Sequence, residues 1–397
     1  MNKTTRIASI DVYRALTMFL MIWVNDFWTL ENIPKWLQHA KSGEDYLGFS
    51  DLIFPWFLFI VGLAIPFAID NRIKKGQSNL QITWHIITRS LALLVMGVFL
   101  VNAESYHAEA TGMAKSWFTI LMISGFFLIW NVYPKATGSK KYLFLGLQFL
   151  GVLVLVYLGL IYRGTTYDSD AVVRMQTRWW GILGLIGWTY MIAAPLYLFF
   201  KKTTWLMWIF WLFFIGLNII GNAGIAYNIF PNQDSNWVVG NGAFHAFAFG
   251  GIVTAGFLRN KNNRTGRLYL MLLLWTVITL GAGFLSRNFF IISKISATPP
   301  WVFFSLSTGF ALYAILHWLV DNRGKVHWFN IIKTAGTATL TCYLIPYFVY
   351  SFRSIFSIHL NDFLTTGWIG LLKSVIYSLF VIFIARLLVR LGIKLKI

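Results

Sequence analysis

The side chains with the clearest capacity for chemistry lie near the start of the chain, where polar residues interrupt two apolar segments. Asn25 ends the first segment, Asp51 opens the second, and His39 lies in the connection between them. An imidazole can accept a proton or carry an acyl group, a carboxylate can hold its tautomer, and an amide can donate a hydrogen bond. If the two segments pack together, these three residues provide what acyl transfer to an amine or hydroxyl requires.

Each of these residues also has a purely structural interpretation. A loop histidine such as His39 is commonly solvated, and Asn25 can form a hydrogen bond between helices. Asp51 can serve the N-terminus of its own helix, where the helix dipole favours an acid. Asp11 and Arg14 lie three apart on one helical face, which is the spacing of an ion pair that positions the first helix. We treat this pair as supporting residues and the other three as candidate catalytic residues.

A second group of polar residues lies in the later part of the chain. Asn241 and His245 are four apart and would share one face of a helix predicted over 239–258. Arg287 and Lys294 lie in a loop where positive charge is otherwise rare, so an anionic substrate group or an acidic partner would explain them. A buried structural histidine and a solvated loop are the alternatives. We predict that these four residues bind substrate.

Transmembrane helices must position these side chains. The chain is 57% hydrophobic and 12% charged, with 19 Trp and 36 Phe, which excludes an ordinary soluble domain. Apolar runs of about 18 residues or more recur along it, each able to cross about 30 Å of hydrocarbon. The predicted fold is all-α, a polytopic membrane helix bundle of about 11–12 transmembrane helices. The predicted spans are residues 7–28, 51–69, 82–101, 116–133, 142–161, 179–200, 204–222, 239–258, 268–285, 300–320, 330–351 and 367–389.

Basic residues predict the orientation. Alternate connections put about twenty Lys and Arg on the side of the N-terminus and about nine on the other side. Both termini are therefore expected in the cytoplasm, and the His39 loop on the opposite side. The formal charge of +19 is distributed over short loops, including Lys3, Arg6 and the segment 259–267, so a nucleic-acid partner is not expected. The side with fewer Lys and Arg holds the longer loops 29–50, 102–115, 162–178 and 223–238.

Several classes of site are absent from the sequence. Cys342 is the single cysteine and lies in an apolar stretch, so no internal disulfide and no redox motif is expected. There is no Walker, GxGxxG, HExxH or GxSxG sequence in a usable context, and we predict no metal. The basic start followed by an apolar run lacks a small-residue cleavage site, so we expect a retained first helix. Without repeats, residues 1–397 are treated as one transmembrane domain, with 7–69 as its catalytic-motif helix pair and 239–350 as its second polar region.

Two stretches of the first helix pair carry a family resemblance. SIDVYRALTMFLMIWVND, followed by QHA and FSDLIFPWFLFIVGLAIPFAI, resembles the heparan-alpha-glucosaminide N-acetyltransferase family and its bacterial relatives. The resemblance is strong over 6–69, fair over 286–350 and vague between them. It implies that cytoplasmic acetyl-CoA acetylates the amino group of a terminal glucosamine across the membrane, with His39 as the active-site histidine. By position, Asn25 and Asp51 match family residues, and Asp11 with Arg14 match its DxxR.

The chain also departs from the family pattern. QHAKSGEDYLGFSD replaces the more usual HAxWNG segment, and an acidic residue before Gly-Leu-Leu is missing from the middle of the chain. Chains of this subgroup also resemble proteins proposed to import amino sugars such as N-acetylglucosamine or N-acetylmuramic acid. A permease is therefore the alternative to an acetyltransferase. The expected location is a bacterial inner membrane, and the expected partners are acetyl-CoA, an amino-sugar acceptor and the lipid bilayer, with a homodimer as an open alternative.

Overall fold

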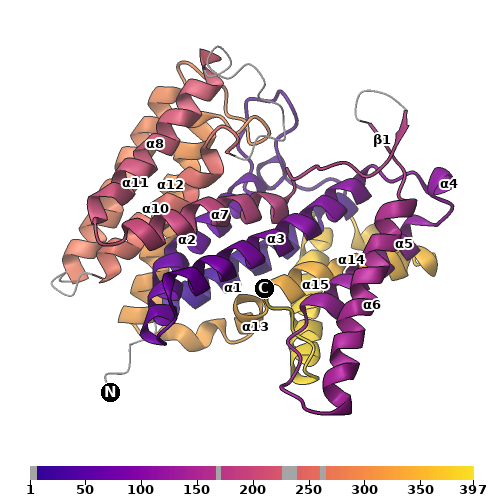
Figure 1. Cartoon of the computed structure of the whole chain (residues 1–397). Coiled ribbons are helices and arrows are strands. Elements are labelled where there is room, and N and C mark those ends of the chain that lie inside the picture. Colours follow the sequence, from indigo (N-terminus) through magenta and orange to yellow (C-terminus); the bar gives the residue numbers. More distant parts are fainter. Residues whose placement is uncertain (1–6, 167–170, 226–238, 260–264) are drawn as a thin grey trace.

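The computed structural model describes residues 7–166, 171–225, 239–259 and 265–397, and its regular structure is almost entirely helical (Figure 1). Lys3, Arg6, most of the loop 223–238 and residues 260–264 of the basic segment lie outside these ranges. The long helices within them are α1 (Ala8–Asn25), α2 (Ser50–Lys74), α3 (Asn79–Glu104), α5 (Lys115–Trp130), α6 (Ser139–Ile161), α7 (Ile182–Phe200), α8 (Thr204–Asn222), α10 (Ala243–Arg259), α11 (Thr265–Ser286), α12 (Pro299–His317), α14 (Thr339–Ile355) and α15 (Gly367–Arg390).

The predicted all-α membrane fold is confirmed. By length and composition, eight helices in the described ranges can cross a membrane, namely α2, α3, α6, α7, α8, α11, α12 and α15. The helices α5 and α10 are apolar but shorter. Both α6 and α11 leave most of their apolar residues uncovered by protein, as expected of surfaces that face lipid. The cytoplasmic position of the termini and the full number of crossings stay predictions.

Short elements connect these helices. The 3₁₀ helices η1 (Phe27–Thr29) and η2 (Lys35–Leu37) lie between α1 and α2, and α4 (Ala108–Thr111) lies between α3 and α5. Two antiparallel strands of two residues each, β1 (Gly164–Thr165) and β2 (Val172–Val173), precede α7. The remaining elements are the π-helical turn η3 (Trp318–Asn322), the 3₁₀ helix η4 (Lys325–Phe329), α13 (Lys333–Thr337) and the 3₁₀ helix η5 (Asp362–Leu364).

One predicted span is wrong as a continuous helix. The segment 330–351 is broken at Ala338, which has φ −132° and ψ 45° and separates α13 from α14. The break follows from packing, because α13 lies against α1 and Arg14 donates a hydrogen bond of 3.4 Å to the Gly336 carbonyl oxygen. A Cβ atom at Gly336 would lie 2.7 Å from the backbone oxygen of Asp11, so only glycine permits this approach.

Successive helices run antiparallel, so alternate connections meet at the same end of the bundle. The α1–α2 connection contacts the α11–α12 connection through Tyr46 and Ile292, and the α14–α15 connection through Glu31 and Thr365. We call this end the His39 face. At the other end, the Asp321 carboxylate accepts hydrogen bonds of 2.9 and 3.1 Å from the first two amides of α1. We call that end the N-terminal face.

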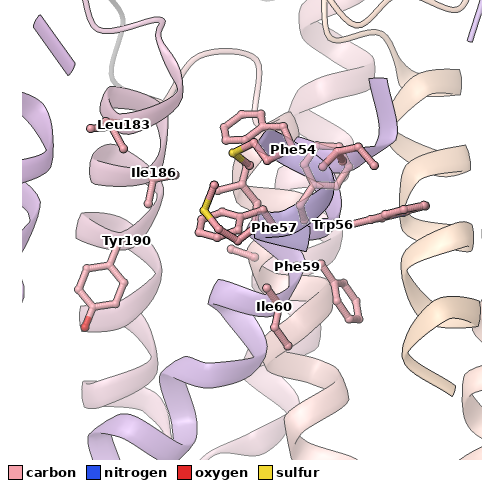
Figure 2. Close-up of a cluster of buried hydrophobic side chains, with 14 of the residues drawn as sticks. Phe54, Trp56, Phe57, Phe59, Ile60, Leu183, Ile186 and Tyr190 are labelled. Carbon is pink, nitrogen blue, oxygen red and sulfur yellow. The ribbon is translucent and has the colours of Figure 1, made fainter. Parts of the chain in front are cut away.

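The core is organised around α2, which packs most extensively against α10 and also contacts α1, α7 and α12. Figure 2 shows its aromatic residues, among them Phe54 and Phe57, with the α7 residues Leu183 and Ile186 beside them. Two glycines allow α2 and α10 to approach closely: a Cβ atom on Gly62 would collide with the α10 backbone, and one on Gly251 with the α2 backbone. This rigid pairing fixes the start of α2, where the candidate site begins.

Candidate functional site

The connection between α1 and α2 brings His39 to the start of α2. His39 Nδ1 lies 2.7 Å from Oδ1 of Asp51, and Lys294 Nζ of the α11–α12 connection lies 3.0 Å from the same ring nitrogen. Lys294 Nζ is also 3.7 Å from Asp51 Oδ1. The side chain of Asp51 is 1% exposed, whereas that of His39 is 42% exposed. A buried acid therefore holds a histidine whose other edge is accessible.

Asp51 is held by the loop and not by its own helix. Its Oδ2 accepts hydrogen bonds from the amides of Ala40 at 3.0 Å and Gly48 at 3.1 Å, while α2 begins at Ser50 without a side-chain cap. Asp51 does lie in the first turn of α2, where the helix dipole favours an acid, but its side chain does not cap the helix. Trp301 Nε1 donates a hydrogen bond of 3.1 Å to the backbone oxygen of Asp51, which anchors this turn to α12.

The contact with Asp51 assigns the tautomer of His39, and once Nδ1 carries a proton the Lys294 ammonium, 3.0 Å from the same atom, lies beside it without donating to it. An ionised carboxylate only accepts hydrogen bonds, so the 2.7 Å contact with Asp51 requires a proton on Nδ1. The Nε2 atom then carries the free lone pair, as a general base or nucleophile needs. Lys294 adds positive charge beside the pair. Burial lowers the pKa of Lys294, although the Asp51 carboxylate opposes this effect.

Ion pairs attach the His39 connection to its neighbours. Arg287 Nη2 lies 2.8 Å from Asp45 Oδ2, and the Ile292 amide donates a hydrogen bond of 2.8 Å to Asp45 Oδ1. These donors hold the pKa of Asp45 below its ordinary value. Lys35 pairs with Glu44 at 2.5 Å within the connection. Arg287 was predicted to bind substrate, but it pairs with Asp45 and is not among the residues that line the cavities described next.

Two cavities lie beside this site and share Asn25 as a lining residue. The larger has a volume of about 1040 Å³ and is lined by residues of α1, α2, α3, α7, α10, α12, α14 and the α11–α12 connection, including Asn25 and Lys294. The smaller, of about 450 Å³, is lined by Asn25 and His39 together with the start of the α1–α2 connection. Asn25 thus lines both cavities. No hydrogen bond from its side chain is found in the described ranges, so the interhelical hydrogen bond considered from sequence is not observed there.

The larger cavity extends from the His39 face into the bundle. Glu104 ends α3 at its mouth, while Trp188 and Thr189 lie about 10 Å further along α7 at 1.5 Å per residue. Its described lining includes none of the connections at the N-terminal face. Lys294 is the one cation in that lining, so the cavity does not offer the multiple cations that CoA phosphates would require. Glu104, Trp188 and Thr189 were not predicted, because nothing in their local sequence marks them.

The second polar group of residues is arranged differently from the prediction. The helix α10 begins at Ala243, so Asn241 precedes it and does not share a helical face with His245. Asn241 Nδ2 donates hydrogen bonds of 3.1 and 3.0 Å to the backbone oxygens of Ser296 and Ala297, close to Lys294 in sequence. His245 is 2% exposed and stacks on Phe214 with ring centroids 4.8 Å apart. Both residues nevertheless line the larger cavity.

Two further charged pairs lie outside the cavity lining. Arg14 Nη1 is 3.8 Å from Asp11 Oδ1, as expected of a pair that positions α1. Asp26, which directly follows α1, is 1% exposed and lies 2.7 Å from Lys373 Nζ of α15. Tyr350 of α14 donates a hydrogen bond of 2.7 Å to the same carboxylate. The local sequence shows Asp26 only as a polar residue at the end of a helix, because these partners are more than 300 residues away.

Within the described ranges, no three His, Cys, Asp or Glu side chains are grouped so that they could hold a metal ion. The arrangement is that of a proton-transfer or acyl-transfer site: an oriented imidazole, a buried acid, a nearby ammonium and an amide that lines both cavities.

Comparison with known proteins places the chain in a family. Residues 6–239 match the model described as "Domain of unknown function (DUF5009)". The chain belongs to the DUF5009 family. The matched residues include Asn25, His39 and Asp51, whereas Lys294 lies beyond them.

Two curated relatives are similar to a shorter part of the chain. The heparan-alpha-glucosaminide N-acetyltransferase of Mus musculus is 32% identical over 101 residues, which is 25% of this chain and 15% of the relative. The protein of the same name from Homo sapiens is 31% identical over 101 residues, which is 24% of this chain and 14% of the relative. The family resemblance predicted from the motifs is confirmed as a distant and partial similarity.

Proposed function

We propose that the protein is a membrane acetyltransferase that moves the acetyl group of acetyl-CoA to the amino group of a glucosamine-type sugar. The observation that carries this proposal is the His39–Asp51 pair, which leaves Nε2 of His39 accessible next to Asn25, which lines both cavities. The partial similarity to N-acetyltransferases of mouse and human supports the same reaction class.

The chemistry assigned to each residue follows from its contacts. The acceptor nitrogen attacks the thioester carbonyl carbon, and Nε2 of His39 removes the proton that this nitrogen loses. Asp51 stabilises the imidazolium that forms. Lys294 and the Asn25 amide can donate hydrogen bonds to the carbonyl oxygen as it becomes negative. The C–S bond then breaks, and the thiolate leaves with the proton carried by His39. A transient acetyl group on His39, formed before the amine attacks, is the second route.

The donor requires a path separate from the large cavity. Acetyl-CoA carries several negative charges and cannot cross hydrocarbon, so its phosphates must stay at an aqueous face with cations. The N-terminal face carries Arg72, Lys74 and Lys75 at the end of α2. We propose that this face is cytoplasmic, that the donor binds there, and that the thioester reaches the site through the bundle. A bacterial inner membrane is the proposed location.

The test uses purified full-length protein in nanodiscs, with labelled acetyl-CoA and glucosamine. Wild-type protein should form acetylated sugar, and His39→Ala should reduce the rate at least 100-fold, while His359→Ala, at an exposed histidine of the α14–α15 connection, should retain it. Transfer that is unchanged in His39→Ala would refute the assignment.

The alternative function is that of a permease for amino sugars, and a second assay tests it. Vesicles containing the protein and no acetyl-CoA would accumulate unmodified N-acetylglucosamine if the cavity belonged to a transport path. With the enzyme proposal, labelled sugar should cross only at the rate of protein-free vesicles.

A further inference from the structure

The large cavity contains polar groups that lack hydrogen-bond partners. Trp188 Nε1, Thr189 Oγ1 and both ring nitrogens of His245 are buried and unpaired in the described part of the chain. All three residues line the cavity. Thr189 is 1% and His245 2% exposed, so bulk water reaches neither side chain freely. Buried polar groups in proteins are nearly always paired, so these atoms indicate a ligand that supplies the missing partners.

The chemistry of the three groups restricts that ligand. An indole N–H only donates, a threonine hydroxyl donates and accepts, and an imidazole offers one donor and one acceptor. The charged residues in the described lining, Glu104 and Lys294, belong to the end of α3 and to a loop. The orphan groups therefore match neutral groups that both donate and accept hydrogen bonds. Hydroxyl groups have this property, and phosphate or carboxylate groups do not.

The walls of the cavity add a shape requirement. Besides Trp188 of α7, aromatic rings from four other helices line it, including Phe54 of α2, Phe244 of α10, Trp301 of α12 and Tyr347 of α14. Flat aromatic faces pack well against the C–H surface of a saturated ring, and a few convergent polar groups then fix its orientation.

We propose that Trp188, Thr189 and His245 form a hydroxyl-binding subsite that holds a neutral sugar ring inside the large cavity. The ring would lie with its substituents directed from this subsite toward Asn25 and Lys294, beside His39. Identifying the bound ring as the acetyl acceptor rests on the proposed function, whereas the subsite itself does not.

The experiment measures binding of radiolabelled N-acetylglucosamine to the purified full-length protein in nanodiscs, without acetyl-CoA. Thr189→Val removes the hydroxyl with little change of shape and should weaken binding about three- to tenfold, as should Trp188→Phe. Thr83→Val is the matched control, because Thr83 Oγ1 is also buried and unpaired but lies outside the cavity lining. This variant should bind as wild type.

Thermal unfolding separates ligand binding from a structural role. Without sugar, Thr189→Val should unfold at the same temperature as wild type or higher, because it loses an unpaired buried hydroxyl. With saturating sugar, it should gain less stability than wild type. Wild-type affinity in both Thr189→Val and Trp188→Phe would overturn the subsite. Acetyl transfer without sugar binding at this subsite overturns only the subsite, and sugar binding without any transfer overturns only the proposed function.

Discussion

The Nδ1 atom of His39 lies 2.7 Å from Oδ1 of Asp51, although the two residues belong to different structural units. His39 follows a 3₁₀ turn in the α1–α2 connection, and Asp51 lies in the first turn of α2. The loop amides on the other carboxylate oxygen keep the acid in place before any substrate binds. The geometry is therefore preorganised, and the remaining Nε2 is directed away from this anchor.

Asp51→Asn should reduce acetyl transfer about 100-fold or more, because an amide can donate to Nδ1 and so favours the tautomer with its proton on Nε2. The shape of the side chain is preserved, and an Asn oxygen in the place of Oδ2 can still accept hydrogen bonds from both loop amides, which directs the NH₂ group toward His39. Initial rates with labelled acetyl-CoA provide the measurement, and the unfolding temperature provides the control for folding. A rate within threefold of wild type in a normally folded variant would contradict the role assigned to Asp51.

Lys294→Met should reduce transfer about 10- to 100-fold, because the ammonium next to His39 and Asp51 stabilises developing negative charge. Since burial lowers the pKa of Lys294, wild-type activity should fall as the pH rises through a value below the ordinary 10.5. The protonated form is the active one, so the loss occurs on the alkaline side. Lys294→Arg should keep partial activity, and its transfer rate should persist to higher pH than that of wild type. An unchanged alkaline limit in the Arg variant would count against this assignment.

Contacts between residues close in sequence could be predicted better than contacts between distant residues. His39 and Asp51 are predictable as a pair because only 12 residues separate them in sequence, which limits how far apart they can lie. The contact between Lys294 and His39 spans 255 residues, and it depends on how α12 packs against α2. Composition and charge patterns do not predict how two helices distant in sequence pack against each other. Lys294 was therefore predicted to bind an anionic group, without any link to His39.

The broken segment at Ala338 illustrates the same limit. Apolar composition predicts a span over 330–351 but does not report how closely Gly336 approaches α1. Likewise, helical spacing predicts Asn241 on one face with His245. In the structure, the Asn241 side chain instead donates hydrogen bonds to the backbone oxygens of Ser296 and Ala297. In both cases a tertiary contact outweighs the local pattern.

Asp45→Asn should lower the unfolding temperature slightly at neutral pH, because it removes the ion pair between the His39 connection and Arg287. The pair is partly exposed, so its contribution is about 0–1 kcal/mol. The pKa of Asp45 is lowered in the folded protein, so this contribution is present above pH 3.8 and is lost as the pH falls through the lowered pKa. The difference in unfolding temperature between variant and wild type should shrink below that pH. A difference that grows with acidification would argue against the pair.

Removing either member of the Asp26–Lys373 pair should destabilise the protein by about 3–5 kcal/mol, because a buried charge is left without its partner. The pair joins the end of α1 to α15, next to Asn25. The double variant Asp26→Asn with Lys373→Met should recover much of this loss, which a double-mutant cycle of unfolding temperatures or denaturant midpoints can measure. Simple additivity of the two single losses would show that the residues do not interact.

Gly62→Ala should prevent normal folding, because its added methyl group would collide with the backbone of Ala248 on α10. Backbone atoms cannot rotate aside as a flexible side chain can, so α2 and α10 would have to separate, at a cost of about 3 kcal/mol or more. The measurement is the yield of monodisperse protein after detergent extraction, together with its unfolding temperature. Gly256→Ala on α10 is the matched control, because a Cβ atom there meets nothing within 4 Å. That variant should fold normally, and its free energy of unfolding should increase by about 0.4–1 kcal/mol. Normal yield and stability of Gly62→Ala would show that the close approach of α2 and α10 does not hold the start of α2, and with it Asp51, in position.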